Sequence, residues 1–213
     1  MTMVLLASAS SRRRDWLLER LRGSGVEVRF SSLLTTEPRP VIGEEVRIQV
    51  ERACLSKARA AISEMRSPDI VEIPDFVVVA DTLVEDPDDS LVPFGKPRGK
   101  SEAVSMLLRL SGRRHRVWSS TAILYPPYAK NAEIEILDGW TAGVWTEYSI
   151  VEFEELDDDR TVWLIGSESW IGKAGGYDIG DEEGASLVLV EGQKVTVLGF
   201  ASGAIDHLVR MIS

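Results

Sequence analysis

A short apolar run near the middle of the chain constrains the fold most. Residues Phe76-Val77-Val78-Val79-Ala80 are continuous and apolar, with polar residues on either side. Such a run is typical of a strand that is covered on both faces. Helical patterns alternate with further strand-like runs along the chain, which favours an α/β or mixed α+β fold. The sequence therefore predicts a central mixed sheet that is flanked by helices.

The size and charge of the chain exclude several classes of protein. The 213 residues suit one large domain or two small lobes around one sheet, and we expect a single domain over 1–213 because no composition break divides them. The composition, 44% hydrophobic and 27% charged, is that of a globular protein. The net charge of -10 opposes a sequence-independent grip on nucleic acid. This net charge is still compatible with a small anionic ligand in a local basic pocket.

Two further features bear on location. Cys54 is the only cysteine, so no intrachain disulfide can form, which fits a reducing compartment. The first eight residues lack the basic segment of a secretion signal, and no run approaches the length needed to span a bilayer. We expect a cytoplasmic protein without membrane contact.

Periodicity and turn signals predict the order of the elements. A helix is expected from the Ser8 to Ser11 cluster to about Arg22, and the strongest helical period runs from Glu44 to Met65. Other helices are expected over 101–110, with Ser101 as its cap, over 157–166 and over 199–212. Strands are expected over 3–7, 26–30, 76–80, 116–124, 148–154 and 186–190, the last of them buried. Residues 86–99 should form a long loop, and 125–143 a hairpin region.

The segment Ser8-Ala9-Ser10-Ser11-Arg12-Arg13-Arg14 is the first candidate site. Arginines in the first turn of a helix are unfavourable next to the positive end of its dipole unless an anion offsets them. Free backbone N–H groups, serine hydroxyls and guanidinium groups together suit phosphate oxygens. The alternative is a basic surface turn whose arginines pair with carboxylates elsewhere.

Lys57 and Asp81 are candidates because polar groups stand where apolar ones are expected. Lys57 lies on the apolar stripe of the long helix, so it either extends past the core edge to water or projects into a polar cleft. Asp81 and Thr82 follow the apolar run, and a carboxylate at the end of a buried strand can serve as a general base or a metal ligand. Capping the next turn is the alternative for Asp81.

Two loop segments are weaker candidates. Lys96, in Gly95-Lys96-Pro97, is a lysine on a restricted turn, a common arrangement in loops. The segment 173–180 begins with Lys173 and contains Gly175, and close glycines let the backbone approach a ligand. A plain turn before the next strand explains that segment equally well, and no Walker A motif is present. His115 and His207 are solitary and are expected to be structural.

The order of these segments resembles the Maf family of nucleoside triphosphate pyrophosphatases. The resemblance covers almost the whole chain and rests on six segments, namely residues 5–14, Lys57-Ala58, Ala80-Asp81-Thr82, Gly95-Lys96-Pro97, residues 110–117 with His115, and residues 173–177. It implies two lobes on a central mixed sheet with the active cleft between them, as in the related inosine triphosphate pyrophosphatases. It also implies hydrolysis of a nucleoside triphosphate to monophosphate and pyrophosphate with Mg or Mn.

The resemblance assigns roles to particular residues. Asp81, Lys57 and Lys96 would be catalytic, with Asp81 activating water, and Glu37 with Asp81 would bind the metal. The substrate would contact Ser8, Ser10, Arg12, Arg13, Thr82, Lys173 and Gly175. Charge neutralisation by cations and a metal suits cleavage between the α and β phosphates, and no covalent nucleophile is required.

Departures from the family pattern bear on which nucleotide base is preferred, and other hypotheses about the function stay open. Gly180 stands where the pyrimidine-preferring subgroup has Gln, whereas Thr82 after Asp81 favours the dTTP and UTP subgroup. The pattern also has Pro at Ser11 and Asp at Gly172. The competing hypotheses are a nucleotide-binding regulator of cell division with little catalysis, and an acidic interaction module. A homodimer is compatible with the sequence, which does not set the oligomeric state.

Overall fold

A mixed sheet of eight strands forms the centre of the molecule. The computed structural model describes residues 1–34, 38–66, 72–129, 132, 134–178 and 187–213. The main strand order is β2-β1-β3-β5-β7-β6, with β4 beside β3 and β8 beside β7. β1 runs parallel to β2 and β3, and the other pairings are antiparallel. The strands are β1 (Met3–Ala7), β2 (Glu27–Ser31), β3 (Phe76–Glu85), β4 (Pro93–Phe94), β5 (Arg114–Tyr125), β6 (Ile134–Leu137), β7 (Trp140–Phe153) and β8 (Leu187–Glu191).

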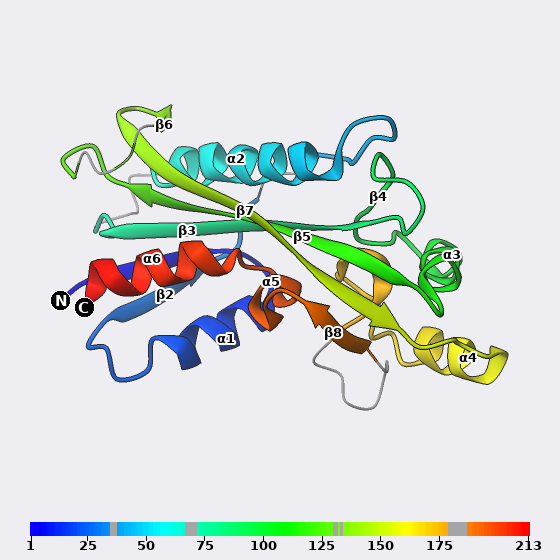
Figure 1. Ribbon diagram of the computed structural model, residues 1–213. Coiled ribbons are helices and arrows are strands. Elements are labelled where there is room, and N and C mark those ends of the chain that lie inside the picture. Colours follow the sequence, from blue (N-terminus) through cyan, green and yellow to red (C-terminus); the bar gives the residue numbers. More distant parts are fainter. Residues whose placement is uncertain (35–37, 67–71, 130–131, 133, 179–186) are drawn as a thin grey trace.

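Helices cover both faces of this sheet, which confirms the predicted mixed α/β architecture (Figure 1). One face carries α2 (Val46–Glu64), and the other carries α1 (Ser11–Arg20) and α6 (Ser202–Ile212). The remaining elements are α3 (Lys100–Leu110), α4 (Asp158–Gly166), the 3-10 turn η1 (Ala174–Gly176) and α5 (Lys194–Leu198). None of the helices in the described ranges is long and apolar enough to cross a membrane.

The residues of β3 divide between the two faces by simple alternation. Val77 and Val79 pack with Cys54 and Ala58 of α2, whereas Val78 and Ala80 lie in the cluster with α1 and α6. All residues of β3 except Thr82 are buried. The apolar run is therefore a strand covered on both faces, as predicted.

β3 is longer than predicted and continues beyond Asp81 to Glu85. The prediction that Asp81 ends the strand is wrong, because β5 pairs with β3 as far as the contact of Val84 with Val117. β1, in contrast, pairs only with Phe76 to Val78. The backbone of β3 beyond Val78 therefore passes the end of β1, and this is where the polar residues Asp81 and Thr82 stand.

Other boundaries also differ from the predictions. Gly99, not Ser101, is the N-cap of α3. The final helix expected over 199–212 begins at Ser202, as α6, because Gly199 has a φ of 117° and ends the separate helix α5. The strands predicted over 116–124 and 148–154 are longer, since β5 and β7 pair along twelve residues.

The edge strand β8 lies outside the core, contrary to the prediction of a buried strand. Val188, Leu189 and Val190 are all exposed. Among the described strands, β8 pairs with β7 alone. Its apolar residues are therefore not covered on both faces. The hairpin expected in the region 125–143 is present, as β6 joined to β7 by a turn at Asp138 and Gly139.

Candidate active site

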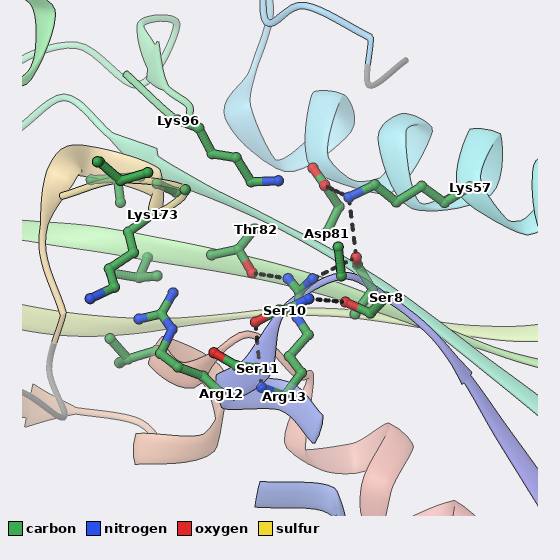
Figure 2. Close-up of a pocket in the computed structure, with 18 of the residues that line it drawn as sticks. Ser8, Ser10, Ser11, Arg12, Arg13, Lys57, Asp81, Thr82, Lys96 and Lys173 are labelled. Atoms are coloured by element: carbon green, nitrogen blue, oxygen red, sulfur yellow. Dashed lines mark hydrogen bonds and ion pairs between the residues drawn. The ribbon is translucent and has the colours of Figure 1, made fainter. Parts of the chain in front are cut away.

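A cavity of about 300 Å³ lies where β3 passes the end of β1. Figure 2 shows that the start of α1, one side of α2, β3 and two loops all turn side chains into it. The cavity brings together nearly all of the residues predicted to form a site. It is lined, among others, by Ser8, Ser10, Arg12, Arg13, Lys57, Asp81, Thr82, Lys96 and Lys173.

The start of α1 contributes backbone N–H groups and hydroxyls. Ser10 is the N-cap, and its Oγ accepts a hydrogen bond from the backbone N–H of Arg13 at 3.4 Å. The Oγ of Ser8 accepts from the backbone N–H of Ser10 at 3.2 Å. The first turn of α1 contains no acidic residue, and residues of this turn line the cavity. This arrangement suits an anion.

Arg13 points inward and is almost completely buried. Its Nε donates to the carbonyl of Gly199 at 2.9 Å, and its Nη1 donates to the carbonyl of Ala80 at 3.0 Å. Its Nη2 donates to Oγ1 of Thr82 at 2.8 Å, and Thr82 in turn contacts the hydroxyl of Ser119 at 2.9 Å. Arg13 therefore joins α1, β3 and the end of α5 while it lines the cavity.

Lys57 and Asp81 form a buried ion pair at the cavity wall. The Nζ of Lys57 donates to Oδ1 of Asp81 and lies 3.4 Å from the carbonyl of Ala80. Both side chains are about one-tenth exposed. Lys57 thus projects into a polar cleft, and the alternative of extending to water is excluded. Asp81 caps no turn, because it lies inside β3.

Arg12 and Lys173 meet at one carboxylate. Oδ1 of Asp178 lies 3.0 Å from Nη1 of Arg12, and its Oδ2 lies 2.9 Å from Nζ of Lys173. The alternative that the arginines pair with carboxylates elsewhere therefore holds for Arg12. The sequence reasoning missed Asp178, although it is an acidic residue inside the glycine-containing segment that was singled out.

Gly175 stands behind the cavity wall and is absent from the residues that line it. Its backbone N–H donates to the carbonyl of Gly95 at 3.1 Å, which ties η1 to the loop that carries Lys96. Its φ of 72° favours glycine, and a Cβ would lie 2.9 Å from Val84 and from the ring of Tyr177. Gly175 thus keeps this wall close-packed.

Tyr177 lines the cavity and is held from behind by His115. The Oη of Tyr177 lies 2.7 Å from Nε2 of His115, and the two rings meet edge to face. Burial lowers the pKa of His115 to about 4 and raises the pKa of Tyr177. Both groups are therefore neutral at pH 7, and His115 has the structural role predicted for it.

Glu37 and Gly180 lie outside the described residues. Within the described residues, no group of three or more His, Cys, Asp or Glu side chains could hold a metal ion. Mg²⁺ is usually bound through one or two carboxylates together with substrate phosphates. Asp81 at the cavity wall fits that requirement for a metal that enters with a phosphate ligand.

Comparison with known proteins identifies the family. The Maf-like protein family matches residues 3–212. The chain belongs to the Maf family. This Maf protein is 33% identical over 207 residues to the dTTP/UTP pyrophosphatase of Anaeromyxobacter dehalogenans, covering 97% of this chain and 92% of the relative. It is 30% identical to the dTTP/UTP pyrophosphatase of Pyrococcus furiosus, covering 99% and 96% of the two chains.

Two solved structures show a weaker likeness to this Maf protein. A nucleoside-triphosphatase described as a dITP/XTP pyrophosphatase from Mycobacterium abscessus is 16% identical, with a TM-score of 0.39 and coverage of 71% and 73%. A HAM1 protein from Coxiella burnetii is 18% identical, with a TM-score of 0.40 and coverage of 68% and 72%. These scores are low, so the fold class rests on the sheet topology described above.

Proposed function

We propose that this Maf protein hydrolyses nucleoside triphosphates, dTTP and UTP in particular, to the monophosphate and pyrophosphate. The observation that carries this proposal is the gathering of five basic side chains and one buried carboxylate in a single cavity. The basic residues are Arg12, Arg13, Lys57, Lys96 and Lys173, and the carboxylate is Asp81. The names of the relatives support the choice of dTTP and UTP.

The basic groups would bind the triphosphate. Arg12, Lys96 and Lys173 place cationic side chains at the cavity, and the first turn of α1 adds backbone N–H groups. Ser8 and Ser10 offer hydroxyls beside that turn. Neutralising the phosphate oxygens stabilises the negative charge that develops on the leaving pyrophosphate.

Arg13, Thr82 and Gly175 would act mainly by shaping the substrate site. Arg13 holds the middle of β3 against α1 through Ala80 and Thr82, so its positive charge stands at a fixed position in the wall. Gly175 fixes the spacing between η1 and the loop of Lys96. These three residues would therefore shape the wall of the site more than they would contact the substrate directly.

Asp81 would act as the general base. Its carboxylate would take a proton from a water molecule whose oxygen attacks the α phosphorus, and the bond to the bridging oxygen of the β phosphate would break. Lys57 fixes the orientation of the Asp81 carboxylate through their ion pair. In Figure 2 the amino group of Lys96 points toward this pair, where it would contact the phosphates.

A divalent metal, Mg or Mn, would be held by Asp81 together with phosphate oxygens, and by Glu37 as the family resemblance implies. When bound, the metal supplies charge stabilisation to the triphosphate. The organisation into two lobes, the homodimer, the cytoplasmic location and the absence of nucleic-acid binding stay predictions.

The decisive experiment measures pyrophosphate release from dTTP, UTP and the other common triphosphates, with Mg and with Mn. Metal-dependent release from dTTP and UTP is the expected result. Saturable binding of these nucleotides without turnover would instead favour the cell-division regulator. Absence of binding would leave the acidic interaction module as the better hypothesis.

A further inference from the structure

Asp178 does not line the cavity itself, but its carboxylate contacts two cations that do, and the activity proposed above has no use for it. It follows Tyr177, which lines the cavity, and its side chain is only 11% exposed. Its two oxygens divide between two cations, with Arg12 of α1 at 3.0 Å and Lys173 before η1 at 2.9 Å. Segments 166 residues apart in the sequence thus meet at one carboxylate.

The two cations are ones that the triphosphate would also contact. The side chains of Arg12 and Lys173 are about one-quarter and one-fifth exposed, and both line the cavity. In Figure 2 their charged ends lie close to one another. A carboxylate and a phosphate accept the same charge-assisted hydrogen bonds from such groups. Asp178 therefore stands where it competes with phosphate oxygens.

We propose that Asp178 is an internal competitor that limits the affinity of the cavity for phosphate anions, above all for the product pyrophosphate. Its charge neutralises part of the field of Arg12 and Lys173, and its oxygens occupy their donors until a triphosphate displaces them. This proposal rests on the proposed function, because it assumes that the cavity binds a triphosphate.

The physical reason concerns product release. Pyrophosphate carries several negative charges, and a cavity with five cations and Asp81 alone would hold it strongly. A carboxylate that returns to Arg12 and Lys173 as pyrophosphate leaves replaces the lost interactions. As a competitor for these two cations, Asp178 sets the balance between anion capture and release.

The test compares the wild type with Asp178→Asn, Asp178→Ala and Asp178→Glu. Binding of inorganic pyrophosphate is measured by calorimetry without metal, so that only the protein's own groups take part. Asp178→Asn and Asp178→Ala should bind pyrophosphate about tenfold more tightly, since a charge that opposes the anion is removed. Asp178→Glu keeps the charge and should stay close to the wild type. In steady-state assays, product inhibition by pyrophosphate should strengthen in parallel.

A matched control is Asp88→Asn. Asp88 also joins two cations, since it lies 2.8 Å from Nη2 of Arg109 and accepts from Arg113, but neither of these arginines lines the cavity. Its removal should leave pyrophosphate affinity unchanged. A general effect of losing one negative charge would appear equally in both variants and would contradict the proposal.

The outcomes separate the two proposals. Unchanged or weaker pyrophosphate binding in Asp178→Asn and Asp178→Ala, with folding intact by circular dichroism, would overturn the role of Asp178 and assign it to holding Arg12 and Lys173 in place. A wild type that binds neither pyrophosphate nor any nucleoside triphosphate would overturn the proposed function itself.

Discussion

Arg13 and Gly199 are 186 residues apart in the sequence, and the Nε of Arg13 donates to the carbonyl of Gly199 at 2.9 Å. A Cβ at residue 199 would lie 2.6 Å from that same Nε. The guanidinium of Arg13 therefore packs directly against the backbone of residue 199, which only a glycine allows. This contact fixes the start of α1, and with it the basic wall of the cavity, against the end of α5.

Arg13→Lys should destabilise the protein by about 2 to 4 kcal/mol, because a lysine cannot reproduce the planar set of hydrogen bonds to Gly199, Ala80 and Thr82. Chemical denaturation at pH 7 measures this change. The control is Arg14→Lys on the same helix, where the arginine is half exposed and contacts Asp15. Equal stability of the two variants would contradict an anchoring role for Arg13.

Gly199→Ala should also destabilise the protein, by at least about 2 kcal/mol. The φ of 117° is unfavourable for alanine, and the new methyl group would displace Arg13. Gly23→Ala separates the cost of the backbone conformation from the cost of displacing Arg13. Gly23 has a φ of 80° but nothing within 4 Å of its Cβ position. We expect Gly23→Ala to cost about 1 kcal/mol. A similar cost at both glycines would show that Arg13 moves aside freely.

Asp81→Asn should lower kcat by at least about 10²-fold if Asp81 is the general base. The same change leaves Lys57 as a buried charge without its carboxylate, so we also expect a loss of stability of about 3 kcal/mol. Thermal unfolding and pyrophosphate release are measured on the same samples. The double variant Asp81→Asn, Lys57→Met should recover stability but not turnover. Near-normal turnover in folded Asp81→Asn would remove Asp81 from the mechanism.

His115 makes stability depend on pH. Burial lowers its pKa from 6.5 to about 4 in the folded protein, so the unfolded chain binds a proton more readily as the pH falls below 6.5. Its contribution to stability is complete above pH 6.5 and is lost toward pH 4. Between pH 7.5 and 5 the loss should be about 2 kcal/mol. Urea denaturation of His115→Gln should show a smaller loss over this range, and an identical pH profile would contradict the assignment.

Discrimination between bases should be modest. Thr82 is small, and its Oγ1 already accepts from Arg13, so it adds little to reading a base edge. A site with few matched polar groups penalises the wrong base weakly. We expect kcat/KM for dTTP and UTP to exceed that for other common triphosphates by about tenfold rather than 10⁴-fold. Strong preference for one nucleotide would indicate recognition by groups beyond those named here.

Much of the fold could be predicted because β3 and α2 have strong patterns. The apolar run before Asp81 indicated a strand covered on both faces, and the apolar stripe of α2 indicated its buried side, including Lys57. The end of β3 could not be predicted, since it depends on pairing with a distant strand, β5. The apolar residues of β8 predict a buried strand, yet β8 is exposed because it lies at the edge of the sheet.

The candidate site could be predicted at positions whose residue type is unfavourable for the local structure. The arginines at the start of α1 and a lysine on an apolar stripe are such conflicts, and both lie at the cavity. Asp178 could not be assigned, because nothing local indicates that it meets Arg12 of α1. The role of Arg13 as an anchor could not be predicted either, since two of its partners, at Gly199 and Ala80, are backbone carbonyls, which carry no sequence signal.

The contact between Arg13 and Gly199 also bears on synthesis of the chain. Gly199 is synthesised 186 residues after Arg13, so the contact can form only once the whole intervening chain has been made. A nascent or prematurely terminated chain therefore has its basic helix start without the backbone that anchors it. A chain that stops before Gly199 therefore lacks this anchor of the pocket, even though it carries the side chains that line the pocket.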